Sequence, residues 1–215
     1  MAKLDGAFGD FQGRMGNMVF YKLNGKTVGR TIGKVETFTE NQKEVHERTS
    51  LISPLLNPLM DFIRIGFKNT PKPWGWDFYS VATSLNKPGA IKGKYPDLEV
   101  DYEKLILSKG DIAPPKNPKV QLNGNSLQFS WDPDTDANHA DTRDQVMLVA
   151  YFPETTKAVF LTSGARRTEG LDQLNLPSFN EDTIIETYMS FIADDRKDVS
   201  NSVYVGQLTW KGNPS

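Results

Sequence analysis

The stretch Val120-Gln121-Leu122-Asn123-Gly124-Asn125-Ser126-Leu127-Gln128-Phe129-Ser130-Trp131 decides the fold of this chain. Within it, Leu127, Phe129 and Trp131 alternate with polar residues, which is the pattern of a strand with one buried face. Asn123-Gly124 favours a tight turn, because both residues tolerate positive φ. The stretch therefore predicts a β-hairpin with one buried side.

Similar segments recur toward the C-terminus. Four more strands are expected, at residues 146–152, 157–162, 183–193 and 201–208, and Pro, Gly or Asp residues mark turns between them. Short strands with this punctuation are typical of a sandwich. The proline-bearing segment 108–118 is interpreted as a linker that precedes it.

Some of these segments resemble a fibronectin type III module. The resemblance is carried by the proline-rich lead-in, Ser130-Trp131, Tyr188-Met189-Ser190-Phe191-Ile192-Ala193 and Ser200-Asn201-Ser202-Val203. It implies that the tryptophan lies under the sandwich and that the tyrosine strand leads into a polar turn. It implies little about function, because such sandwiches serve many unrelated roles.

A second hairpin is expected near the N-terminus, where Met18–Leu23 and residues 26–32 flank Asn24-Gly25. Val19, Tyr21 and Leu23 alternate on one side, with Val28 and Ile32 on the returning strand. A lone hairpin is marginally stable, so it needs further partners. The chain's own segment 98–107 is one candidate, and the edge of another copy is the alternative.

Helices are expected between the hairpin and the sandwich. Thr39-Glu40-Asn41-Gln42 forms a capping box that begins the first helix. Because prolines cannot sit deep in a regular helix, Pro54 and Pro58 predict a break near Ser53. A second helical piece should end at about Gly66, and a third should span residues 77–86.

The predicted fold class is therefore an α+β N-terminal domain (β-hairpin plus helices) over residues 1–112, followed by an all-β fibronectin-III/Ig-like sandwich over residues 113–215. The composition agrees with soluble globular domains, since aromatic residues make up 11% and charged residues 24% of the 215 residues. The chain has no cysteine, which excludes disulfides and thiol nucleophiles. No apolar signal core or membrane-length run is present, so the expected location is the cytoplasm, or export by a route without a classical signal.

The net charge of −2 gives no overall attraction to nucleic acid or anionic membrane. The two halves differ, because residues 1–113 contain 16 Lys+Arg and 13 Asp+Glu (+3) and residues 114–215 contain 9 and 14 (−5). This asymmetry would favour head-to-tail contact between copies. Ordinary scatter of surface charge is the preferred interpretation.

Candidate interaction residues cluster in the N-terminal part. Phe8, Phe11 and Met15 lie in a glycine-rich segment that lacks the spacing of a nucleotide-binding loop. Such a segment packs on its own domain or docks on a neighbouring subunit. The hairpin adds further candidates for the same contact: Val19, Tyr21 and Val28.

An aromatic loop contributes Trp74, Trp76, Phe78 and Tyr79. Packing over the end of a helical core is the preferred interpretation. The alternative is a glycan-binding surface that uses Trp74, Trp76 and Tyr79, because sugar faces stack on aromatic rings.

No catalytic residue, cofactor site or metal site is predicted. Residues 132–136 place carboxylates at alternate positions, as calcium loops do, but Ala137 and Arg143 replace the glycine and glutamate of that motif. A solvated acidic loop is the preferred interpretation there, and also for the turn with Asp194, Asp195 and Asp198. His46 and His139 lack the spacing of a zinc motif.

The order of parts also resembles an uncharacterised family of Bacteroidota proteins, and phage-type structural proteins. It is carried by the glycine-rich start, the hairpin ending in Gly29-Arg30, the Thr-Glu-Asn-Gln helix start and the sandwich. The resemblance implies a structural role. We therefore expect a non-enzymatic subunit that self-associates through its N-terminal segment and hairpin edge into a filament, fibre or virion-like assembly. Its partners would be other copies, with no nucleic acid and no membrane, and a glycan-binding module is the alternative.

Overall fold

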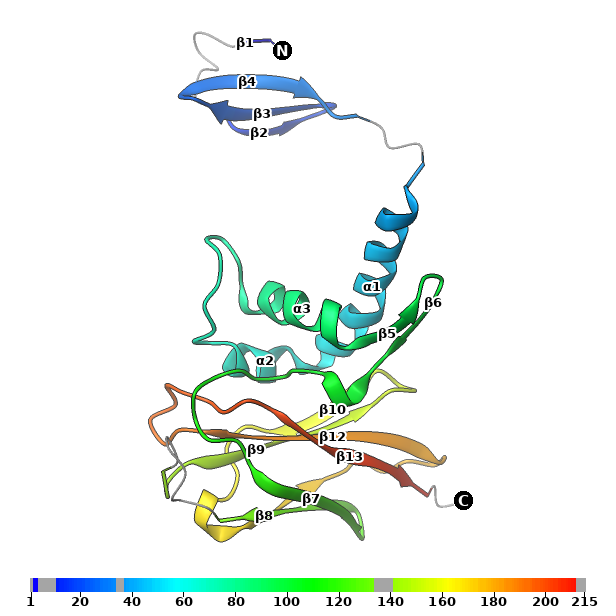
Figure 1. Ribbon diagram of the computed structural model, residues 1–215, viewed down its shortest axis with the longest axis vertical. Coiled ribbons are helices and arrows are strands. Elements are labelled where there is room, and N and C mark those ends of the chain that lie inside the picture. Colours follow the sequence, from blue (N-terminus) through cyan, green and yellow to red (C-terminus); the bar gives the residue numbers. More distant parts are fainter. Residues whose placement is uncertain (1, 4–10, 34–36, 134–140, 212–215) are drawn as a thin grey trace. The chain divides into compact units, whose positions relative to one another are not determined.

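The computed structural model describes residues 2–3, 11–33, 37–133 and 141–211 (Figure 1). The fold is mixed, as the α+β prediction required, with helices and several antiparallel sheets. The chain forms two compact units, Met1–Lys43 and Glu44–Ser215. No helix in the described ranges is long and apolar enough to cross a membrane.

The N-terminal unit contains a four-stranded antiparallel sheet in the order β1-β4-β3-β2. The strands are Ala2–Lys3 (β1), Gly13–Met15 (β2), Met18–Leu23 (β3) and Lys26–Thr31 (β4). The predicted hairpin is therefore confirmed, and its turn residues Asn24 and Gly25 have φ values of 50° and 76°. The segment 98–107 does not pair with it, because β1 and β2 occupy the two edges.

The buried positions of this sheet differ from the prediction. Phe20 is 9% exposed, whereas Leu23 is 46% exposed and Val19 and Tyr21 are half-buried. Phe20 is buried because its ring lies over Gly29, where an added Cβ would stand 2.7 Å from the ring. A glycine opposite an aromatic ring is a feature that a simple alternation pattern does not reveal.

The second unit contains the predicted sandwich. One sheet has the order β10-β9-β12-β13 and the other β11-β8-β7. The strands of the first are Lys157–Leu161 (β10), Gln145–Phe152 (β9), Thr183–Ile192 (β12) and Val203–Trp210 (β13), and those of the second are Leu171–Asn175 (β11), Ser126–Asp132 (β8) and Lys116–Asn123 (β7). Strand β11 was not predicted.

The core between the two sheets follows the alternation in β8. Leu127 and Phe129 are fully buried, and Trp131 is 4% exposed. The Trp131 ring meets Phe191 edge-on at 5.8 Å, and its Nε1 donates to the Arg167 carbonyl at 2.8 Å. The polar end of the buried indole is therefore satisfied, as a buried tryptophan requires.

Helices cover the face of the β10-β9-β12-β13 sheet that points away from the three-stranded sheet (Figure 1). They are α1 (Glu40–Leu56), the 3-10 turn η1 (Asn57–Leu59), α2 (Met60–Gly66) and α3 (Phe78–Gly89). Because β9 is covered on both faces, its residues from Val146 onward are all buried and form one apolar run. A short hairpin, β5 (Ile91–Lys94) with β6 (Asp97–Val100), follows α3.

The predicted start of α1 is confirmed. The Thr39 amide donates to Gln42 Oε1 at 3.0 Å, and the Gln42 amide donates to Thr39 Oγ1 at 3.3 Å. The predicted break near Ser53 is wrong, because α1 continues through Pro54 to Leu56. Core packing supplies the reason, since the residues beside the proline are buried: Ile52, Leu55 and Leu56.

The segment 108–118 is not a free linker. Ser108 is fully buried and donates from Oγ to the Ser200 carbonyl at 2.8 Å, and the Lys109 amide donates to the Gly66 carbonyl at 2.9 Å. The segment thus joins the helices to the sandwich instead of separating them. The domain boundary expected between residues 112 and 113 consequently falls inside the second compact unit.

Candidate functional site

The N-terminal sheet presents an apolar face. Residues that pair directly across antiparallel strands lie on the same face, which places Met15 opposite Met18, and Gly13 opposite Phe20. Phe11 contacts the Phe20 ring edge-on at 5.5 Å. Met15 is 51% exposed and Phe11 37% exposed, so this apolar face, formed by Phe11, Met15, Met18 and Phe20, is only partly covered.

The opposite face of the same sheet is basic. Arg14, Val19 and Arg30 form one row across β2, β3 and β4, and Lys26 pairs with Leu23. Tyr21 and Val28 form a row between them. We call this the basic face: Arg14, Val19, Tyr21, Leu23, Lys26, Val28 and Arg30.

Strand β2 forms one edge of the sheet, and its residues Gly13–Met15 are exposed. Such an edge offers backbone amides and carbonyls that can pair with another strand. Four of the predicted interaction residues, Met15, Val19, Tyr21 and Val28, therefore lie in one small sheet, divided between its two faces. Phe11 precedes the sheet, and Trp74 and Trp76 lie on the loop before α3. Phe8 lies outside the described residues.

The preferred interpretation of core packing is confirmed for Phe78 and Tyr79, which are half-buried against the helical core, and is wrong for Trp74 and Trp76. Trp74 is 100% exposed and Trp76 42% exposed. Gly75 has a φ of 83°, and the Trp76 amide donates to the Pro73 carbonyl at 3.1 Å, so a tight turn holds the two indoles away from the core.

The base of this loop is fixed to the helices. Asp77 caps α3 by accepting from the Ser80 amide at 2.8 Å, and that hydrogen bond lowers the pKa of Asp77. Tyr79 Oη donates to Asn57 Oδ1 at 3.2 Å, and the Arg64 guanidinium lies 5.4 Å from the centre of the Phe78 ring. The exposed tryptophans therefore project from a fixed base.

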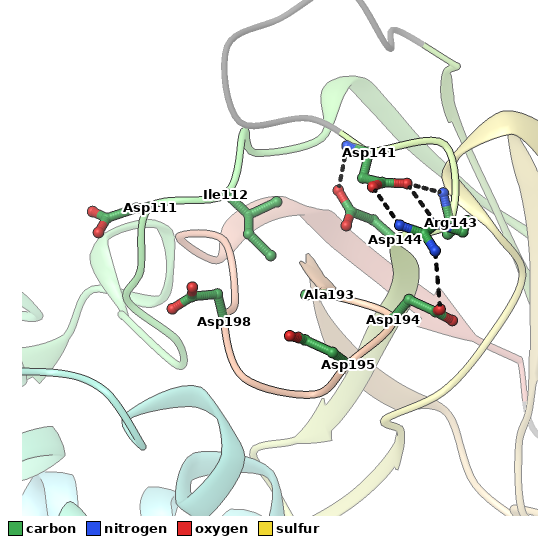
Figure 2. Close-up of a pocket in the computed structure, with 9 residues that line it drawn as sticks. All are labelled: Asp111, Ile112, Asp141, Arg143, Asp144, Ala193, Asp194, Asp195 and Asp198. Carbon is green, nitrogen blue, oxygen red and sulfur yellow. Dashed lines mark hydrogen bonds and ion pairs between the residues drawn. The ribbon is translucent and has the colours of Figure 1, made fainter.

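A hollow of about 450 Å³ at one end of the sandwich is lined mainly by carboxylates (Figure 2). Its acidic residues come from three separate segments of the chain: Asp111, Asp141, Asp144, Asp194, Asp195 and Asp198. Only the last three of these residues form a visible group in the sequence. The others could not be found by spacing, because tertiary structure alone brings them together.

Most of these carboxylates have local partners. Arg143 binds Asp141 at 3.1 Å and approaches Asp194 at 3.9 Å, as the dashed lines of Figure 2 show. The hydrogen bonds from Arg143 lower the pKa of Asp141 to about 2. Asp195 pairs with Lys197 at 3.1 Å, and Asp198 accepts from Asn69 at 2.8 Å.

The described residues contain no group of three or more His, Cys, Asp or Glu side chains arranged to hold a metal ion. The calcium-like loop falls largely outside the described residues, as does His139. His46 is exposed on α1. The hollow is therefore an acidic feature of the surface.

A family model matches residues 11–206, from the N-terminal sheet to the last strand of the sandwich. The chain belongs to DUF6266, a family of unknown function. No curated protein matches the chain. The family match covers the N-terminal sheet, the helices and the sandwich together.

Proposed function

We propose that this DUF6266 protein is a non-enzymatic structural subunit that self-associates through its N-terminal sheet. The observation that supports this most directly is the sheet itself, which forms a separate compact unit with an exposed edge strand and a partly exposed apolar face. Large exposed side chains grouped on one face are typical of contact surfaces. Filaments, fibres and virion-like particles are the assemblies such a subunit could form.

The geometry allows two kinds of contact at once. Strand β2 can add a strand from a second copy, while Met15 and Phe11 beside it can be buried by the same partner. Backbone pairing supplies directional hydrogen bonds, and the apolar side chains supply the desolvation free energy. Both contributions favour association of the N-terminal sheet with a second copy.

We further propose that the sandwich is fibronectin type III-like. Its division into a three-stranded and a four-stranded antiparallel sheet, with Trp131 of β8 in the core between them, supports that assignment. The suggested relation to Bacteroidota and phage-type structural proteins belongs to the same proposal.

The test is the molar mass of the purified full chain, measured by size-exclusion chromatography with light scattering over a range of concentrations. We expect a mass above that of the monomer, and the variant Met15→Glu should lower it by placing a charge on the apolar face. Leu122→Glu is the matched control, because Leu122 is 39% exposed on the sandwich. A wild-type chain that stays monomeric at all concentrations would contradict the proposal.

A second candidate function is favoured by one observation, the complete exposure of Trp74 beside the half-exposed Trp76. We propose glycan binding by this loop as the alternative. Tryptophan fluorescence during titration with oligosaccharides tests it, and Trp74→Ala should abolish any response. The buried Trp131 is the internal control, since its substitution would disturb the sandwich core and not the loop. Flat titrations with a broad glycan panel would remove this alternative.

A further inference from the structure

The N-terminal sheet carries an unusual distribution of charge. Its strands β2, β3 and β4 and their turns contain four cationic residues and no acidic residue: Arg14, Lys22, Lys26 and Arg30. By the pairing register, Arg14 and Arg30 flank Val19 in one row of the basic face, and Lys26 lies on the same face. No ion pair to Arg14, Lys26 or Arg30 is found among the described residues.

The sandwich end of the chain carries the opposite charge. Residues 114–215 have 9 cationic and 14 acidic side chains, a net charge of −5. Asp141, Asp194, Asp195 and Asp198 of this region line the hollow of Figure 2, together with Asp111 from the preceding segment. The net charge around the hollow stays negative, because Arg143 is shared between Asp141 and Asp194.

We propose that the basic face of one copy docks on the acidic end of the sandwich of a second copy. This inference rests on the proposed self-association and names the surfaces that meet. The two surfaces carry complementary charge: Arg14, Lys26 and Arg30 share one face of the sheet, and a group of carboxylates lines the hollow on the other unit. The contact is heterologous, so each copy can bind one neighbour through its sheet and another through its sandwich.

A head-to-tail contact of this kind explains two features together. The basic face lies opposite the apolar face, so docking on the sandwich of one neighbour leaves the apolar face and strand β2 available for the contact proposed above. At the docked basic face, electrostatic attraction sets the orientation and speeds association. The contact should weaken with added salt, because charges separated by more than about 10 Å are screened at 0.1 M ionic strength.

The experiment is a charge-swap test on the full chain, with molar mass measured by light scattering. One variant is Arg14→Glu/Arg30→Glu and the other Asp111→Lys/Asp194→Lys. We expect each alone to weaken assembly by about tenfold or more, as loss of complementary charge does at interfaces. An equimolar mixture of the two should recover assembly, because the reversed sheet then faces a reversed sandwich.

Two variants control for net charge. Asp61→Lys/Glu99→Lys makes the same change of charge as the sandwich variant at positions whose side chains are 72% and 74% exposed away from the hollow. Lys92→Glu/Lys157→Glu matches the sheet variant. Both controls should assemble like the wild type, and equal loss in a control and its matched variant would overturn the proposal.

The remaining outcomes are distinct. A wild-type chain that never exceeds monomer mass removes the proposed function and this inference together. Assembly that ignores salt and both charge reversals overturns the inference alone and leaves self-association intact. If Arg14→Glu/Arg30→Glu assembles normally but loses binding to a dye-labelled single-stranded oligonucleotide, the basic face serves nucleic acid instead, and the inference is wrong.

Discussion

Arg167 is a buried residue that contacts several segments of the sandwich. It pairs with Asp144 at 3.1 Å, and the two side chains are only 2% and 3% exposed. Its guanidinium also donates to the Ala113 carbonyl at 2.8 Å and lies 3.9 Å from the centre of the Phe191 ring. One side chain therefore connects the segment before β7, the start of β9 and the core residue Phe191 on β12.

Replacing Arg167 by Met should destabilise the fold by about 3–5 kcal/mol, because Asp144 would be left buried without a counter-charge. Chemical denaturation measures this change. Arg143→Ala is the control, since the exposed Arg143–Asp141 pair should contribute less than about 1 kcal/mol. If both variants lost a similar amount of unfolding free energy, burial of the Arg167–Asp144 pair would not be the source of the stability.

A second residue-scale prediction concerns glycine. An added Cβ at Gly66, the last residue of α2, would lie 2.4 Å from the Leu107 carbonyl oxygen. Gly66→Ala should therefore destabilise the fold by about 1–3 kcal/mol through overpacking, although alanine favours helices. Gly89 ends α3 with no atom within 4 Å of an added Cβ, so Gly89→Ala should be neutral or stabilising. The measurement is the thermal unfolding midpoint of each variant. A lower midpoint for Gly89→Ala than for Gly66→Ala would contradict the close approach of Gly66 to Leu107.

Among the elements, the strands with clean alternation were predictable from sequence, and those with weak patterns were not. Leu127, Phe129 and Trp131 mark β8 plainly, whereas β11 buries only Leu174 and so leaves little periodic signal. The break in α1 that Pro54 predicted is absent, because core packing of the neighbouring residues outweighs the low helix propensity of proline.

The candidate sites were less predictable than the fold. The glycine-rich segment indicated that Phe11 and Met15 make a contact, but the strand β2 that contains Met15 was not predicted. The exposure of Trp74 could not, because an aromatic residue in a proline-bearing loop is as compatible with core packing as with solvent. Which side of a loop faces water depends on long-range contacts that a sequence pattern does not encode.

The layer between the helices and the β10-β9-β12-β13 sheet contains several tyrosines. Burial raises the pKa of Tyr151 to about 12 and raises the pKa of Tyr102. Burial also raises the pKa of Tyr188 and, together with the hydrogen bond to Glu186, that of Tyr204. These tyrosines stay neutral in the folded chain at pH values where an unfolded tyrosine, with a pKa of about 10, ionises.

The neutral phenols stabilise the fold fully below pH 10, and that contribution is lost as the pH rises from 10 toward the raised folded pKa values. We expect the free energy of unfolding to fall between pH 10 and 12 in urea titrations. Absorbance at 295 nm should show these tyrosines ionising at a higher pH in the folded chain than in the urea-unfolded chain. A single transition at pH 10 for all tyrosines would contradict the burial of this layer.

At the scale of the whole molecule, the two compact units have separate cores. Neither buried cluster of the second unit includes a residue from Met1–Lys43. The helices and the sandwich, by contrast, share one cluster, since Ile52 and Phe62 pack in the same core as Met147 and Tyr188. Stability and assembly are therefore expected to reside in different parts of the chain.

This separation predicts the behaviour of a fragment that spans residues 37–215. It keeps the capping box of α1 and both buried clusters, so its unfolding midpoint in circular dichroism should match that of the full chain. It lacks the N-terminal sheet of β1 to β4, so its mass by light scattering should be that of a monomer. If the fragment assembled like the full chain, the contacts would have to lie on the sandwich or the Trp74 loop. If it failed to fold, the N-terminal unit would be supporting the core and could not act as a separate adhesive part.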